Sequence, residues 1–298
     1  MKVLKFGGTS VAHASNINKV IEIVLESLKP KQKIVVVVSA LSGITDDLIM
    51  LVNFASKGDL KYEIIFKAIC GRHDQVIKEL IHSKNKEKVS EEINQKYKEL
   101  KEIVKNIFLT QKLPPSALDA VMSFGEQLSS YVIGEALKSR GIPCEFIDSR
   151  DIIKTDHNFG NASVDLEKSY KLISDCLKGE NLLIMGGFIG STKEGITTTL
   201  GRGGSDYTAS LVGAALNASV IEIWTDVDGI MTADPKKIKE ALLIPEITYE
   251  KAEEMAYNGA KVIHPKTIKP AVLRNIPIYV KNTFNSSGGG TKISNGKK

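Results

Sequence analysis

The segment KFGGTS, which starts at Lys5, has the composition of a turn that binds an anion. Gly7 and Gly8 let the backbone bend tightly and come close to a ligand. Lys5, Thr9 and Ser10 add hydrogen-bond donors, and a following helix would point its free N–H groups and positive dipole end at the same place. The lysine precedes the glycines, so this is neither a Walker A loop nor a GxGxxG motif. A phosphate-binding loop and an ordinary turn with a surface lysine both remain open.

Three later segments repeat this combination of glycines and hydroxyl groups at the predicted end of a strand. They are residues 39–43 (SALSG), residues 186–187 (GG) and residues 197–206 (TTTLGRGGSD). Ligands of open α/β sheets bind beyond the carboxyl ends of the strands, so we expect these loops to converge on one crevice. Arg202 lies between glycines and is suited to bidentate binding of a carboxylate or phosphate. The alternative is a flexible surface arginine.

Glu126 lies in the middle of a helical pattern that is apolar on nearly all sides, which predicts a buried helix. Pro114–Pro115 break the preceding pattern, and Ser116 with Asp119 predict a capping box that opens this helix, which runs to about Arg140. A buried carboxylate requires a cation or hydrogen-bond donors. Its partner is either an internal basic side chain or the ammonium group of a ligand, and both remain open.

Two turns in the C-terminal half are candidates for a nucleotide site. Residues 224–230 (WTDVDGI) end a predicted strand, and residues 232–236 (TADPK) form a second turn. Lys261 follows a predicted helix end and is a second candidate cation for phosphate. His264 precedes a proline and is interpreted as a structural hydrogen-bonding residue. The sequence contains neither a metal-binding spacing of Cys and His nor a Ser–His–Asp arrangement.

The elements that position these residues alternate between strand and helix patterns. Strands are predicted at residues 3–6, 34–38, 144–148, 182–187, 219–224 and 276–282. Helices are predicted at residues 15–28, 166–177, 205–216, 249–257 and 265–274. The continuous β-branched run at 34–38 is typical of a parallel strand covered on both faces. Residues 45–140 form a helical insertion of about four segments, and the Gly/Ser/Lys-rich residues 285–298 are predicted to be a flexible linker or tail.

The composition predicts a globular α/β protein. Of 298 residues, 42% are hydrophobic and 25% are charged, which excludes disorder, collagen-like repeats and a coiled coil. No apolar run is long enough to span a bilayer, and the N-terminus lacks a signal-peptide core, so we expect a cytoplasmic protein. The net charge is +5, and the charges of residues 57–112 alternate in sign, which argues against a nucleic-acid partner. Three separated cysteines predict no disulfide framework: Cys70, Cys144 and Cys176.

Six motifs in this order resemble those of the aspartokinases of the amino-acid kinase family. They are KFGGTS (5–10), VSA (38–40), SFGE (123–126), GRGGSD (201–206), WTDV (224–227) and GAKVIHP (259–265). The resemblance extends from residue 2 to about residue 284. It implies ATP-dependent phosphorylation of the L-aspartate β-carboxylate to 4-phospho-L-aspartate, the first step towards lysine, threonine and methionine. It also implies a three-layer α/β/α sandwich around a mainly parallel sheet, with an aspartate-binding lobe (about 1–180) and a nucleotide-binding lobe (about 181–284).

The resemblance also implies roles for individual residues. The catalytic residues are Lys5, Asp206 and Lys261, with Asp206 organising the two lysines. The residues that hold aspartate are Ser39, Thr45, Glu126, Arg202 and Ser205. The residues that bind ATP and its phosphates are Lys5, Gly7, Gly8, Thr9, Ser10, Thr225, Asp226, Met231, Lys236 and Lys261. Met231 and Lys236 depart from the Tyr and Arg that the family often has there. MgATP is the implied co-substrate, with no protein ligand assigned to the metal, and a homodimer is expected.

The implied chemistry agrees with the residue types. A carboxylate nucleophile with an unperturbed pKa of ~3.9 is already ionised at pH 7, so no general base is required. The reaction needs neutralisation of charge and in-line positioning, which lysines, glycine-loop N–H groups and Mg²⁺ supply. Two alternatives remain: a sister kinase for acetylglutamate, glutamate, carbamate or UMP, or a non-catalytic amino-acid or nucleotide sensor. Both retain the fold.

The length departs from that of most aspartokinases, which continue into ACT domains or are fused to homoserine dehydrogenase. This sequence ends where the linker to ACT domains would begin. A truncated catalytic domain and a natural form without ACT domains both remain open. Without ACT domains there is no second site to supply a coupling free energy, so we expect that lysine and threonine do not inhibit the activity.

Overall fold

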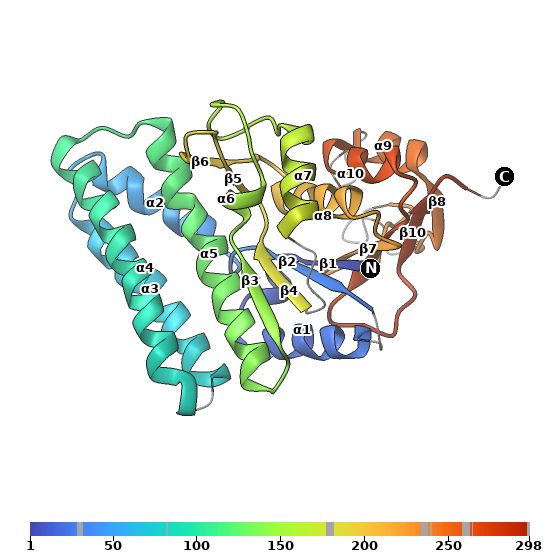
Figure 1. The fold of residues 1–298 in the computed structure, drawn as a ribbon, viewed down its shortest axis with the longest axis horizontal. Helices are drawn as coiled ribbons and strands as arrows, with labels where there is room; N and C mark the ends of the chain where they lie inside the picture. The colour runs from blue at the N-terminus through green and yellow to red at the C-terminus, as the bar shows by residue number, and fades with distance from the viewer. Residues whose placement is uncertain are drawn as a thin grey trace.

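An eight-stranded sheet runs between two layers of helices in the computed structural model (Figure 1). The structure describes residues 1–28, 32–81, 83–176, 182–233, 238, 240–257, 263 and 265–296, without the side chains of 83, 84, 257, 265 and 266. The strand order is β3-β4-β2-β1-β7-β9-β10-β8. The first six strands in this order are parallel: β3 (Cys144–Ile147), β4 (Leu182–Gly186), β2 (Ile34–Val38), β1 (Lys2–Phe6), β7 (Val220–Thr225) and β9 (Ile278–Asn282). The mainly parallel α/β architecture is therefore confirmed.

Two hydrophobic cores lie on opposite faces of this sheet. Successive strand residues point to opposite faces, so Leu4 and Phe6 enter one core while Val3, Val35 and Val37 enter the other. The first core packs against α1 (Ala14–Ser27) and the helical insertion. The second packs against α7 (Leu166–Cys176), α8 (Gly204–Ala215), α9 (Tyr249–Tyr257) and α10 (Pro265–Leu273). Burial on both faces explains why β2 is β-branched throughout.

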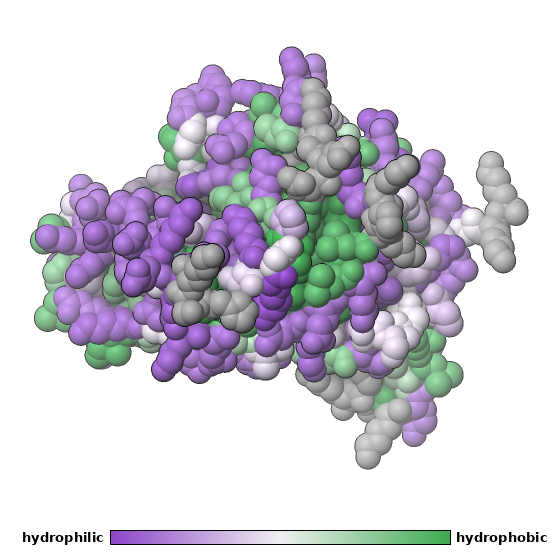
Figure 2. All heavy atoms as spheres, turned by 60° about the horizontal axis from the view of Figure 1, so that its bottom comes forward, coloured by the Kyte–Doolittle hydropathy of each residue, from purple (hydrophilic) through white to green (hydrophobic). Residues whose placement is uncertain are grey.

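The helical insertion has the four predicted segments. They are α2 (Ile44–Ala55), α3 (Lys61–Leu80), α4 (Ser83–Thr110) and α5 (Pro115–Ser139). Helices α3 and α4 form a pair at one end of the molecule, at the left of Figure 1. That end is covered mainly by hydrophilic side chains, whereas apolar side chains gather nearer the middle of the face turned forward in Figure 2. No helix in the described part of the chain is long and apolar enough to cross a membrane.

The start of α5 differs from the sequence prediction. Pro114 is the N-cap, Pro115 is the first helical residue, and no side chain caps the helix. Asp119 instead accepts hydrogen bonds from Gly160 and Thr199 in distant segments. The predicted capping box is therefore wrong. Pro115 suits the first helical position, because its missing N–H group is one that the first turn would leave without a partner.

The C-terminal segment is also a correction. Residues 285–298 were expected to be a flexible linker or tail, but they contain β10 (Thr291–Ser294). This strand pairs antiparallel with β9 and parallel with β8 (Glu246–Thr248), and Ile293 is fully buried. The Gly/Ser-rich composition forms the turn that precedes β10, where Gly290 has a φ of +71° that favours glycine. Composition alone therefore misassigned a strand that completes the sheet.

A separate hairpin next to the main sheet was not predicted. Strands β5 (Ile189–Ser191) and β6 (Thr197–Thr199) pair antiparallel in a two-stranded sheet. Both strands are only three residues long, with the sequences IGS and TTT, which is too short to show the apolar pattern of a strand. The hairpin matters because its end forms part of the cavity described next.

Candidate active site

A cavity of about 630 Å³ lies where the loops after β1, β2 and β4 meet the N-terminus of α8. Eight of the residues predicted to form the site line it: Lys5, Gly8, Ser39, Thr45, Glu126, Arg202, Ser205 and Asp206. The carboxyl ends of parallel strands lie at one edge of a sheet, which is why these separate segments converge. The predicted convergence of the polar glycine-rich loops is therefore confirmed.

Glu126 forms one wall of the cavity. Its side chain is buried, and Oε1 accepts a hydrogen bond from the backbone N–H of Ala40 at 3.2 Å. The two segments touch closely, because a Cβ atom on Gly125 would lie 2.7 Å from the Cβ of Ala40. Oε2 has no hydrogen-bond partner among the described residues. Of the two possible partners for this carboxylate, no internal base forms an ion pair with it within the described part of the chain.

Burial controls the protonation of Glu126. Removal from water raises the pKa of its carboxyl group to about 8, while the Ala40 N–H and the positive charge of Lys5 act in the opposite direction. The empty protein therefore favours the neutral form near pH 7. A cation that enters the cavity would favour the charged form and bring the pKa down.

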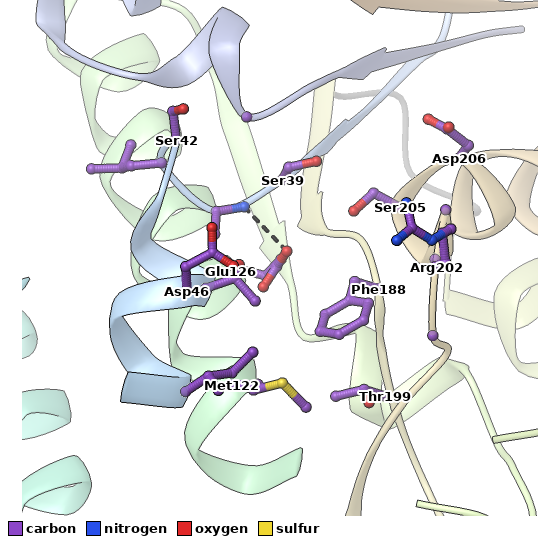
Figure 3. Close-up of a pocket in the computed structure, with 18 of the residues that line it drawn as sticks. Ser39, Ser42, Asp46, Met122, Glu126, Phe188, Thr199, Arg202, Ser205 and Asp206 are labelled. Carbon is purple, nitrogen blue, oxygen red and sulfur yellow. Dashed lines mark hydrogen bonds between the residues drawn. The ribbon is translucent and has the colours of Figure 1, made fainter. Parts of the chain in front are cut away.

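The opposite wall is the loop that leads into α8. Gly201 and Gly203 have φ angles of +76° and +73°, a region that favours glycine, and they allow the sharp turn that presents Arg202. The guanidinium of Arg202 is exposed and forms no ion pair with any residue that the structure describes. Figure 3 shows Glu126 and Arg202 on opposite sides of the cavity, with the ring of Phe188 between the two walls.

Lys5 and Asp206 form an ion pair at the base of α8. The distance from Lys5 Nζ to Asp206 Oδ1 is 2.6 Å, and the side chains are only 11% and 15% exposed. Lys5 lies near the end of β1 and Asp206 in the first turn of α8, so the pair joins the two elements that frame the cavity. The contact holds the lysine charge at the cavity.

Apart from Lys5 and Gly8, the KFGGTS segment lies around the cavity rather than in it. Gly7 donates its N–H to the carbonyl of Trp224 at 3.0 Å, and Thr9 begins a short 3₁₀ helix, Thr9–Val11. Ser10 is fully buried, and its hydroxyl bonds the hydroxyl of Thr283 at 2.7 Å. Ser10 therefore joins the N-terminal loop to the segment after β9, and its hydroxyl already has a partner within the protein.

The predicted nucleotide residues are only partly described. Thr225, Asp226 and Met231 do not line the cavity. Thr225 ends β7 and donates its hydroxyl to the exposed carboxylate of Asp226 at 3.2 Å, and Met231 bridges to Leu243. Three further predicted positions lie outside the described residues: Lys236, Lys261 and His264. No group of three or more His, Cys, Asp or Glu side chains is arranged to hold a metal ion within the ranges the structure describes.

Sequence reasoning missed Phe188, which lines the cavity. Its φ of +67° is an outlier for a bulky residue. Its N–H donates to the hydroxyl of Thr208 at 3.1 Å, and its carbonyl accepts from the N–H of Leu200 at 2.8 Å. A Cβ atom on Gly204 would lie 2.8 Å from the Phe188 ring, so a glycine is needed there. The available signal was its position directly after two glycines at the end of a strand.

The chain matches the amino acid kinase family over residues 1–282. It is 38% identical over 296 residues to lysine-sensitive aspartokinase 3 of Escherichia coli, covering 98% of this chain and 64% of that protein. It is 36% identical over 297 residues to the chloroplastic bifunctional aspartokinase/homoserine dehydrogenase 1 of Zea mays, covering 98% of this chain and 32% of that protein.

One solved structure with a fold similar to that of this chain contains bound ligands. E. coli aspartokinase III in complex with aspartate and ADP superimposes with a TM-score of 0.91 at 36% identity. The match covers 100% of this chain and 65% of that one. The present chain thus spans about two thirds of the bacterial relative and about one third of the plant relative.

Proposed function

Since the chain belongs to the amino acid kinase family, we propose that it transfers the γ-phosphoryl group of MgATP to the β-carboxylate of L-aspartate. The product would be 4-phospho-L-aspartate, at the start of the route to lysine, threonine and methionine. The observation that carries the proposal is an acidic and a basic side chain that face each other across one cavity. Glu126 presents a buried carboxylate oxygen without a partner among the described residues, and Arg202 presents an unpaired guanidinium from the other wall.

An α-amino acid fits this arrangement of charge. Its α-ammonium group would satisfy Glu126 Oε2, and its α-carboxylate would pair with the planar fork of Arg202. Burial makes an uncompensated carboxylate costly, so a ligand that brings an ammonium group removes that cost on binding. Ser39, Thr45 and Ser205 line the same cavity and supply hydroxyl groups for the rest of the substrate.

The phosphoryl transfer needs little beyond positioning and charge neutralisation. One oxygen of the ionised β-carboxylate forms a bond to the γ-phosphorus, while the bond from that phosphorus to the bridging oxygen breaks and ADP leaves with the electron pair. Both reactants are anions, so a fixed cation lowers the barrier. Lys5 is that cation, and its ion pair with Asp206 keeps it in place without a reorganisation step.

The nucleotide half of the proposal rests on the family resemblance. It assigns Gly7, Gly8 and Thr9 to the phosphates, together with Lys261, and assigns Thr225, Asp226, Met231 and Lys236 to the nucleotide pocket. Mg²⁺ would arrive with the phosphates, whose charge it neutralises, and no protein carboxylate is assigned to it. The E. coli relative was solved with aspartate and ADP, which supports a site for both substrates in one chain of this fold.

The proposal also includes a homodimer and a cytoplasmic location. Light scattering of the purified chain measures its mass directly against the 32.5 kDa of one protomer. A mass of one protomer at micromolar concentration would contradict the dimer while leaving the activity proposal intact, because the cavity described above is formed by residues of one chain.

A hydroxylamine trap tests the activity most directly. The chain is incubated with MgATP and L-aspartate, ADP release is followed, and the acyl phosphate is captured as its hydroxamate. We expect hydroxamate in proportion to ADP. Matched reactions contain acetylglutamate, glutamate, carbamate or UMP in place of aspartate. Turnover of one of these without turnover of aspartate would assign a sister kinase, and no turnover of any would indicate a binding protein.

A further inference from the structure

Asp119 is a fully buried carboxylate that forms no part of the proposed reaction. Its Oδ2 accepts hydrogen bonds from the backbone N–H groups of Gly160 and Thr199, at 2.9 Å and 2.7 Å. Its Oδ1 accepts a third from the Thr199 hydroxyl at 3.0 Å. No cation is paired with it within the described ranges. Burial raises the pKa of this carboxyl group, and the three hydrogen bonds partly offset that effect.

The three bonds join α5 to the wall that carries Arg202. Thr199 is the last residue of β6, three positions before Arg202, and both Thr199 and Gly160 line the cavity. The Thr199 carbonyl accepts from the N–H of Ala162 at 2.9 Å, so this residue is held on both sides. A Cβ atom on Gly201 would lie 2.7 Å from Asn161 Oδ1, which places the same loop directly against the arginine turn.

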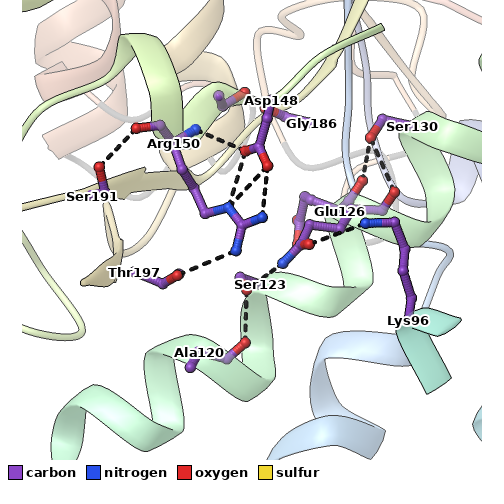
Figure 4. A network of polar contacts seen from close by, with 12 residues as sticks. Lys96, Ala120, Ser123, Glu126, Ser130, Asp148, Arg150, Gly186, Ser191 and Thr197 are labelled. Atoms are coloured by element: carbon purple, nitrogen blue, oxygen red, sulfur yellow. Dashed lines mark hydrogen bonds and ion pairs between the residues drawn. The ribbon is translucent and has the colours of Figure 1, made fainter. Parts of the chain in front are cut away.

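Asp119 is also fixed relative to the other wall. It precedes Glu126 by seven residues on α5, which is about two helical turns or ~10 Å along the helix axis. One hydrogen bond links α5 to α4, because Gln127 accepts from Lys96 at 3.5 Å, and Gln127 in turn donates to the Ser123 hydroxyl within α5 at 2.8 Å (Figure 4). Helix α5 is also buried along most of its length, and close packing limits its movement, so we expect a change in the separation of the walls to come mainly from the β6 side.

We propose that Asp119 is a positioning residue that sets the separation between the Glu126 carboxylate and the Arg202 guanidinium. This inference rests on the proposed function, because those are the two charges assigned to the substrate backbone. A tie of three hydrogen bonds in a fully buried site holds this spacing before substrate arrives. Loss of these three hydrogen bonds would leave the ion pair between Lys5 and Asp206 untouched, since that pair does not involve Asp119.

Four variants test this role by the aspartate KM. Asp119→Ala removes all three bonds, and we expect the aspartate KM to rise about tenfold or more, since small displacements of binding groups are costly. The ATP KM should change less than about twofold. Asp119→Asn should restore most of the affinity, because its amide oxygen can accept from both N–H groups while its NH₂ donates to the Thr199 hydroxyl.

The adjacent threonines supply a matched control. Thr199→Val removes one bond to Asp119 and should raise the aspartate KM by less than Asp119→Ala does. Thr198→Val makes the same replacement one position away and removes the buried bond to the Thr155 hydroxyl, 2.7 Å long. Thr198 does not line the cavity, so its variant should leave the aspartate KM unchanged. If Asp119→Ala does not fold, the comparison of the two valine variants decides.

A merely structural role has a different signature. Partial unfolding lowers the maximal rate per total protein and leaves the KM of the folded fraction as it was. That outcome, or an equal rise of the aspartate KM in both valine variants, would overturn the proposal.

Hydrogen exchange separates this inference from the proposed function. We expect the amides of residues 199–203 and Gly160 to exchange faster in Asp119→Ala than in the wild type, with no such change in Thr198→Val. Unchanged exchange there would overturn the positioning role whatever the substrate is. A different outcome is that the wild type fails to phosphorylate aspartate while the amides of residues 199–203 and Gly160 still exchange faster in Asp119→Ala. That result would refute the proposed function and retain the role of Asp119 in joining the cavity walls.

Discussion

Two buried ionisable side chains show how the surroundings of a group decide its use. Glu126 in the cavity wall and His73 within α3 are both almost wholly removed from water. Each has one hydrogen-bonded polar atom, through Ala40 in one case and the Ile69 carbonyl in the other, and each has a second polar atom without a partner among the described residues. Burial favours the neutral form of both, raising the pKa of Glu126 to about 8 and lowering that of His73 to about 4.

The difference lies in what the unpartnered atom faces. Glu126 lines a cavity opposite an unpaired arginine, so a ligand can restore its charge. His73 lies on the buried face of α3 and lines neither the main cavity nor the smaller one beside α1. One group is thus poised for binding, whereas the other only adds a pH-dependent term to stability. Four predictions test this difference between the cavity and the helical insertion. They are ordered by the size of the expected effect, beginning with the largest.

The largest effect is expected at Lys5. Lys5→Ala should lower kcat by about 10²–10³-fold, because a fixed charge beside the transferring phosphoryl group stabilises the transition state most. The aspartate KM should change far less. Steady-state rates at saturating aspartate and MgATP measure this. A kcat within a few-fold of the wild-type value would remove Lys5 from the phosphate side of the cavity.

Arg202→Ala should raise the aspartate KM by about 100-fold and leave the ATP KM nearly unchanged. The guanidinium binds a carboxylate that does not change during the reaction, so its loss affects ground state and transition state alike. Loss of a close charge pair costs several kcal/mol, and each ~1.4 kcal/mol is tenfold in affinity. Arg202→Lys should rescue only in part, since it restores charge without the planar fork. A raised ATP KM with normal aspartate binding would instead place Arg202 beside phosphate.

Glu126→Gln should raise the aspartate KM by about tenfold, with a distinct pH signature. Aspartate binding to the wild type should strengthen from pH 6 to pH 8, as the carboxyl group loses its proton, and the glutamine variant should lack this trend. The stability of the folded protein depends on pH in the opposite direction. The raised pKa means that the folded state holds the proton more tightly, so wild-type stability falls as pH rises from about 4.5 through about 8. Thermal melts of the wild type and Glu126→Gln without ligand, recorded at several pH values, measure this. Melting temperatures that change in parallel with pH would contradict it.

His73 should affect acid stability and nothing in the cavity. Its lowered pKa means that the unfolded chain binds the proton more tightly, so stability is fully present above pH 6.5 and is lost as pH falls towards about 4. The loss amounts to about 3 kcal/mol over that window. His73→Leu should flatten this part of the profile in urea titrations between pH 4 and pH 7. A changed aspartate KM in this variant would show that the insertion and the cavity are coupled.

The amino-acid sequence by itself determined the main strands, the helices and the order of the polar loops. The predicted boundaries of the β2 and α9 segments agree with the structure, and the other predicted elements agree to within two residues. These features depend on local patterns: a β-branched run, a 3.6-residue apolar period, or glycines that follow a strand. The convergence of the loops that carry Lys5, Ser39 and Arg202 also followed from sequence, because the parallel α/β pattern places strand ends at one edge. Glu126 lies within a helix, and only the family resemblance placed it with them.

Only the tertiary structure decided which polar groups bond one another. Asp119 seemed locally to be a capping residue, but its partner Thr199 lies 80 residues away. The hydroxyl of Ser10 bonds that of Thr283, 273 residues away, which no local pattern indicates. The tail around Thr291 had the composition of a linker and became a strand because β8 and β9 offered it edges. In each case the outcome depends on a neighbour that only folding brings near, and a short polar side chain satisfies its hydrogen bonds wherever burial places it.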